Sequence, residues 1–222
     1  MAKVVSTRAA GSGTGSRAGF TIIELLVVVG IMMLLTAVLL AGISHVKKTA
    51  ANAKAQDLVS NVATAFNQVL QNDRNWSGRL IRASQAGEPV VDSEACQTLI
   101  RHKVYSLSYK KRSDGTYELT GVDRFGIVDP WTAQFLKSHP SAGIGTKVPG
   151  GGTVKDHILR FAIDDDYDGI CEVRIEGASL RVRASVAVWS CGQNGKFESY
   201  SSVGRVEGSD DLFSWTPGQV VK

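Results

Sequence analysis

The chain contains the sequence Gly19-Phe20-Thr21-Ile22-Ile23-Glu24, which is followed at once by the uncharged run from Leu25 to Ile43. At about 1.5 Å per helical residue, this run comes close to the ~30 Å hydrocarbon core of a bilayer. One carboxylate, Glu24, stands inside the apolar segment, where a lone acid costs about 2–4 kcal/mol. A carboxylate inside an apolar segment therefore indicates a functional residue, and its charge requires a compensating partner group.

The charges on either side of the apolar segment predict its orientation. Residues 1–19 contain Lys3, Arg8 and Arg17 and no acid, whereas Lys47 and Lys48 follow the segment. The positive-inside rule therefore puts the N-terminus in the cytoplasm, with the C-terminal domain on the other side of the membrane.

Three interpretations of the segment compete. A secretory signal has an apolar region of about 7–15 residues and a small-residue cleavage site, for which Ala51-Asn52-Ala53 would serve, but this run is longer. A plain signal anchor explains the length and leaves Glu24 and the Gly19-Phe20 junction without a reason. The third interpretation is a prepilin.

Residues Gly19 through Glu24 resemble the class III signal of type IV pilins and type II secretion pseudopilins. In that superfamily a prepilin peptidase cuts after the Gly on the cytoplasmic side, and the new N-terminal residue is methylated. The resemblance implies a cut between Gly19 and Phe20 and N-methylation of Phe20. Glu24 would then be the fifth residue of the mature chain, where the family places its acid.

Electrostatics supports an assembly role for Glu24. Cleavage would expose an α-amino group on Phe20, and in a packed bundle this group can approach the Glu24 carboxylate of a neighbouring subunit. Each buried charge then has a partner, whereas an unpaired buried charge is strongly destabilising. We therefore expect Glu24 and Phe20 to act in subunit register and not in chemistry.

The helix is expected to continue past the membrane segment. Leu58, Val62, Phe66 and Val69 recur at helical spacing on an otherwise polar stretch. The predicted organisation has four parts. Residues 1–19 are a cleaved leader, and residues 20–45 are a membrane or filament-core helix. Residues 46–71 are the amphipathic half of the same helix, and residues 72–222 are a globular pilin-like domain.

Period-2 alternation predicts a small antiparallel sheet in the globular part, covered by the amphipathic half of the helix. A hairpin is expected around Ser113-Asp114-Gly115, and the remaining strands are expected at 158–163, 173–175 and 180–188. The predicted fold class is α+β: a long N-terminal helix, transmembrane in its first half, packed on this sheet.

Two further segments resemble the major pseudopilin of type II secretion. Asp129-Pro130-Trp131 is similar to a motif ahead of its sheet, and Val188 to Lys196 with Asp210 to Trp215 is similar to its closing calcium loop. The resemblance implies that Asp210 and Asp211 bind Ca²⁺ with backbone carbonyls of the loop, a donor set that suits this ion. The motif's Asp is Asn194 here, so a solvated acidic turn before Trp215 is the alternative.

A second acidic cluster has the opening pattern of a calcium loop, D-x-D-x-D-G, at Asp164, Asp166, Asp168 and Gly169. The EF-hand needs a bidentate Glu at its twelfth position, and Ile175 stands there. A full EF-hand is excluded. We expect a tight acidic turn between strands, with a calcium site as the alternative.

The three cysteines allow one disulfide bridge in an oxidising compartment, and Cys171 with Cys191 is the candidate pair, although all three could remain reduced. No C-x-x-C pair exists, so a zinc site is not expected. The four histidines stand in unrelated sequence contexts and no catalytic set emerges, so we predict no enzyme. The net charge of +4 is scattered, which predicts no nucleic-acid partner.

The resemblance therefore predicts a structural subunit of a periplasmic pseudopilus that polymerises through its N-terminal helix. Its expected partners are copies of itself, prepilin peptidase, other pseudopilins, the inner-membrane assembly platform and membrane lipid. One alternative is a type IV pilin of a surface pilus for adhesion, motility or DNA uptake. The other is a membrane-anchored calcium-binding module that never polymerises.

Overall fold

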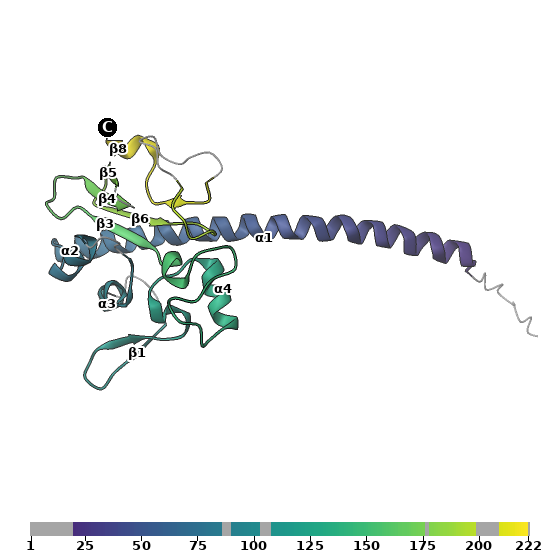
Figure 1. The fold of residues 1–222 in the computed structure, drawn as a ribbon, viewed down its shortest axis with the longest axis horizontal. Helices are drawn as coiled ribbons and strands as arrows, with labels where there is room; N and C mark the ends of the chain where they lie inside the picture. Colours follow the sequence, from purple (N-terminus) through teal and green to yellow (C-terminus); the bar gives the residue numbers. More distant parts are fainter. Residues whose placement is uncertain (1–19, 86–89, 103–107, 176–177, 199–208, 222) are drawn as a thin grey trace, which may run out of the picture. The chain divides into compact units, whose positions relative to one another are not determined.

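The structure is a computed structural model that describes residues 20–85, 90–102, 108–175, 178–198 and 209–221 (Figure 1). The leader 1–19, with Gly19, lies outside the described residues. The chain divides into two compact units, Met1–Lys47 and Lys48–Lys222. Helix α1, Ile22–Asp73, runs from the first unit into the second.

In the first unit, α1 is apolar and exposed. Its segment Ile22–Leu39 is long and apolar enough to cross a membrane, and none of it is buried. A signal sequence near the N-terminus can also contain an apolar helix of this kind. The chain therefore carries one N-terminal apolar helix that could serve as a membrane anchor.

In the second unit, one face of α1 is buried. Ala55, Val59, Val62, Phe66 and Val69 recur every three or four residues and are at most 2% exposed. This spacing places them along one stripe of a helix. The expected stripe is confirmed at its last three positions, while Leu58 is half-buried beside Val59.

The strands form three small antiparallel sheets where the sequence predicted one. The first pairs β1 (Tyr109–Lys111) with β2 (Tyr117–Leu119), which confirms the predicted hairpin. The second has the order β3-β6-β7 and the third the order β4-β5-β8. In the second sheet, β3 is Arg160–Ile163, β6 is Val186–Ser190 and β7 is Leu212–Phe213. In the third sheet, β4 is Cys171–Ile175, β5 is Ala178–Val182 and β8 is Val220–Val221.

The single strand predicted over 180–188 is wrong. The chain bends between Val182 and Val186, so β5 pairs with β4 while β6 pairs with β3 in another sheet. The bend is held by backbone hydrogen bonds from Arg183 to Gln219 and from Asp164 to Ser185. Alternation continues across the bend, so a period-2 pattern cannot reveal it.

Strand β6 explains why the second sheet is buried on both faces. Val186 and Val188 belong to the cluster that contains the stripe of α1, whereas Ala187 and Trp189 belong to a second cluster with Trp215. Successive side chains point to opposite faces of a strand. The ring of Phe161 from β3 stacks on Phe66 of α1 with centroids 5.0 Å apart.

Short helices complete the second unit. Side chains of Asp92 and Asp129 accept backbone N–H groups at the starts of α3 and α4, and Pro130 occupies the first turn of α4. Helix α4 was not predicted. The helices are α2 (Gly78–Gln85), α3 (Ser93–Arg101), α4 (Pro130–Ser138), and the 3₁₀ turns η1 (Gly121–Phe125), η2 (Val154–His157) and η3 (Pro217–Gln219).

Candidate functional site

The start of α1 is a capping box built from Thr21 and Glu24. The Glu24 Oε2 atom accepts hydrogen bonds of 2.9 Å from both the backbone N–H and the hydroxyl of Thr21. The Glu24 backbone N–H donates in return to Thr21 Oγ1 at 3.2 Å. Two N–H groups that an α-helix leaves unpaired are satisfied reciprocally.

This arrangement gives Glu24 a partner within its own chain. The T-x-x-E spacing of Thr21 and Glu24 is typical of a capping box, although this box was not predicted from the sequence. Phe20, one residue before the cap, is 78% exposed. The predicted processing residue Phe20 and the predicted assembly residue Glu24 therefore lie on one exposed helix end, where other molecules can reach them.

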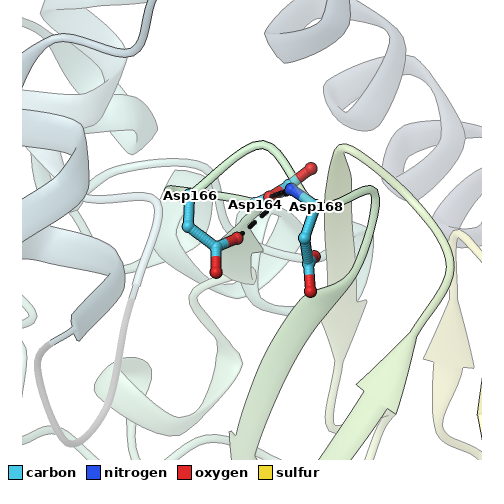
Figure 2. Close-up of side chains that lie close together, drawn as sticks. All are labelled: Asp164, Asp166 and Asp168. Carbon is cyan, nitrogen blue, oxygen red and sulfur yellow. Dashed lines mark hydrogen bonds between the residues drawn. The ribbon is translucent and has the colours of Figure 1, made fainter.

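The acidic turn between β3 and β4 brings three carboxylates together (Figure 2). One oxygen from each of Asp164, Asp166 and Asp168 lies within 4.8 Å of the other two. Among the described residues, no other group of three or more acids, histidines or cysteines lies close enough together to hold a metal ion. The predicted acidic turn between strands is thus confirmed, with a geometry that admits a cation.

Hydrogen bonds inside the turn compete for the same oxygens. Asp164 accepts the backbone N–H groups of Asp168 at 3.1 Å and Gly169 at 2.8 Å, and Asp168 accepts that of Ile170 at 2.7 Å. Burial raises the pKa of Asp164, and the backbone donor Gly169 opposes the rise. A cation would have to share oxygens that already accept hydrogen bonds from the backbone.

Ile175 confirms that the turn is no EF-hand. It is the last residue of β4 and is 7% exposed in the second core cluster. An apolar side chain supplies no oxygen ligand, and the strand carries it away from the turn.

At the C-terminal turn, the carboxylates of Asp210 and Asp211 accept hydrogen bonds from backbone N–H groups. Asp210 Oδ2 accepts the N–H groups of Gln193 at 2.6 Å and Asn194 at 3.1 Å. Asp211 Oδ2 accepts the N–H of Glu198 and the hydroxyl of Ser209, both at 2.9 Å. The two carboxylates therefore close the turn that follows β6.

One oxygen of this turn remains available for a cation. Asp210 Oδ1 is buried and has no hydrogen-bond partner among the residues that the structure describes. Asn194, which replaces the acid of the resembled motif, donates its side-chain amide to Glu198 at 2.8 Å. The described residues thus offer one open carboxylate oxygen here and no converging set of acids.

The motif Asp129-Pro130-Trp131 opens α4. Asp129 is fully buried and caps the helix, whereas Trp131 is half-buried and lines an open groove of about 500 Å³ beside α1. Ala50, Ala51 and Lys54 form the opposite wall. The groove is open, and both polar and apolar side chains line it.

The candidate pair Cys171 and Cys191 is not bridged in this structure, where both residues are buried thiols. The Cys171 thiol donates to the carbonyl of Ala184 at 2.8 Å, and Cys191 accepts a hydrogen bond from the Arg160 guanidinium. Cys171 begins β4 and Cys191 follows β6, and these strands belong to different sheets. Burial, with a smaller contribution from Asp164, raises the pKa of Cys171 to about 12.

Comparison with known protein families, curated proteins and solved structures gives no match to this chain.

Proposed function

We propose that this chain is a prepilin whose mature form, Phe20 to Lys222, is a filament subunit. The mature chain would most resemble the major pseudopilin of type II secretion. It would wait in the inner membrane with its C-terminal domain in the periplasm and polymerise through its N-terminal helix into a periplasmic pseudopilus. Its work is mechanical: the growing fibre moves cargo toward an outer-membrane channel.

The observation that carries the proposal is an apolar helical segment, Ile22–Leu39, that no other described residue buries, with one acid in its first turn. Ile22–Leu39 is entirely exposed, so lipid or other copies of the helix must cover it. Glu24 is the acid in its first turn. A lone carboxylate in such surroundings requires a cation, and an α-amine on Phe20 of a neighbouring subunit supplies one.

The capping box agrees with this role. Thr21 holds the Glu24 carboxylate at the tip of the helix, directly beside the residue that would carry the new α-amine. In the membrane before assembly, these local hydrogen bonds lower the cost of an unpaired carboxylate. In a filament, the same carboxylate can exchange them for a charged partner.

Mass spectrometry of the mature N-terminus tests the proposal. The chain is expressed in a host with an active prepilin peptidase, and a Gly19→Leu variant serves as the uncleaved control. The expected product begins at an N-methylated Phe20. An intact leader, or a cut after Ala53, would overturn the filament proposal.

A second candidate is a membrane-anchored calcium-binding module that never polymerises, and the Asp164–Asp166–Asp168 cluster favours it. Chemical crosslinking in membranes separates the two functions. A ladder of covalent multimers supports the filament, whereas monomers with calcium-dependent stability support the module. If fibres form, their place decides between a periplasmic pseudopilus and a type IV pilus on the cell surface.

A further inference from the structure

A buried ion pair joins the residue that caps α4 to η2. His157 Nδ1 lies 2.6 Å from Asp129 Oδ2, and each side chain is 1% exposed. The other oxygen of Asp129 accepts the backbone N–H of Thr132 at 2.8 Å. The two residues stand 28 positions apart in the chain, so no local pattern predicts the pair.

The second ring nitrogen has an acceptor as well. His157 Nε2 lies 2.9 Å from the carbonyl oxygen of Gly151. A carboxylate and a carbonyl only accept hydrogen bonds, so both ring nitrogens must donate. A neutral imidazole has one N–H and one lone pair, and only the imidazolium makes both bonds.

The charges that face His157 favour the imidazolium. Burial by itself lowers the pKa of His157, but the hydrogen bond and charge of Asp129, the Gly151 carbonyl and the charge of Asp156 together raise it. Asp129 comes from the start of α4 and Asp156 from η2, where the Asp156 carboxylate also accepts from Thr153. Backbone atoms of two glycine turns also lie against the ring, at Gly151 and Gly195.

These two turns are in close contact at the histidine. A Cβ atom on Gly151 would lie 2.6 Å from the carbonyl oxygen of Asn194, and one on Gly195 would lie 2.9 Å from His157 Nε2. Both positions have positive φ, at 137° and 66°. The histidine therefore joins the loop Gly150–Gly152 at the point where this loop packs on the turn Gln193–Gly195.

We propose that His157 is a pH-dependent latch: as an imidazolium it ties Asp129 to Gly151 and holds the loop Gly150–Gly152 on the turn Gln193–Gly195, and the latch opens when the proton leaves. This inference does not depend on the proposed function. It requires only the described second unit.

The direction of the pH effect follows from linkage. The folded pKa of His157 lies above its ordinary value of 6.5, so folding favours the protonated form. The stabilising contribution is fully present below about pH 6.5 and is lost as the pH rises through the folded pKa. Alkaline conditions therefore loosen the loop, and acidic conditions close it.

The test uses the full chain in detergent micelles with ¹⁵N-labelled histidine. Nuclear magnetic resonance is expected to find two protonated ring nitrogens on His157 at pH 6.5, with one lost at higher pH. Amide signals of Gly150–Gly152 and Gln193–Gly195 are expected to shift with the same midpoint. A neutral His157 at pH 6.5, or amide signals that do not follow the ring, would overturn the latch.

Unfolding of two variants gives an independent readout. His157→Gln removes the titrating group, and His139→Gln removes a histidine on the exposed end of α4 as the matched control. The unfolding constant of His157→Gln divided by that of the wild type should fall by up to tenfold per pH unit above pH 6.5, until the folded pKa is passed. The same ratio for His139→Gln should not follow the His157 midpoint, and equal profiles for both variants would contradict the proposal.

Discussion

The indole N–H of Trp76 donates a hydrogen bond of 2.7 Å to the backbone carbonyl of Asp164, a residue 88 positions further along the chain. Trp76 follows the end of α1, and Asp164 begins the acidic turn. The backbone N–H of Trp76 also donates to the Tyr167 hydroxyl at 2.7 Å, and that hydroxyl donates to Asn75. The end of the long helix therefore fixes the conformation of the turn that carries the three converging carboxylates.

Replacing Trp76 with Phe should destabilise the second unit by about 1–3 kcal/mol. The substitution keeps an aromatic ring but leaves the buried carbonyl of Asp164 without its donor. Urea unfolding of the full chain in detergent, followed by circular dichroism, measures the loss. Trp131→Phe is the matched control, since Trp131 is half-buried in an open groove, and a change below about 1 kcal/mol is expected there. Equal losses in both variants would contradict the role of the indole N–H.

Gly192→Ala should disrupt the C-terminal turn. The backbone at Gly192 has a φ of +66°, and an added Cβ would lie 2.5 Å from the carbonyl oxygen of Asp210. Gly115→Ala is the control, because Gly115 has a φ of +84° with open space around it. Left-handed backbone alone costs about 1–2 kcal/mol in the control. We expect Gly192→Ala to lose at least about 2 kcal/mol more in urea unfolding, and a similar loss in both would refute the close approach.

Glu24→Gln separates the two roles of Glu24. The amide keeps an oxygen that can accept from Thr21, so the capping box survives, but the negative charge is gone. If Glu24 pairs with the α-amine of a neighbouring subunit, Glu24→Gln and Glu24→Ala should both insert into the membrane and both fail to form crosslinked multimers. Normal multimers from Glu24→Gln with none from Glu24→Ala would assign Glu24 to capping alone.

Calcium should raise the melting temperature of the full chain, and the double substitution of Asp210 and Asp211 by Asn should abolish that shift. Among the described residues, Asp210 Oδ1 is a buried carboxylate oxygen without a hydrogen-bond partner, so it is the atom of this turn that could accept a cation. Both acids also hold backbone N–H groups, so the variant is less stable in any case, and the quantity to compare is the shift caused by calcium.

The control for calcium is the double substitution of Asp166 and Asp168 by Asn, which is expected to retain the shift. Loss of the shift in that variant would move the site to the acidic turn. The absence of a shift in the wild type would end the calcium hypothesis for both turns.

Helix α1 could be predicted closely because its signals are local. The expected bounds, about 20 to about 71, differ by two residues at each end from Ile22–Asp73. An uncharged run followed by apolar residues every three or four positions defines a helix without reference to the rest of the chain. The hairpin around Gly115 and the acidic turn ending at Gly169 were predictable for the same reason, since their turn residues are adjacent in sequence.

Local sequence patterns therefore predict the elements whose signals repeat over neighbouring residues: the apolar helix with Glu24 at its start, the buried stripe and most of the strands. How distant segments meet depends on the folded chain. The bend between β5 and β6 preserves alternation, and Cys171 and Cys191 are thiols that contact Ala184 and Arg160 instead of each other. The pair of Asp129 with His157 likewise depends on packing between α4 and η2. The physical reason is that a hydrogen bond needs two groups at contact distance, and only the folded chain brings residues separated by tens of positions that close.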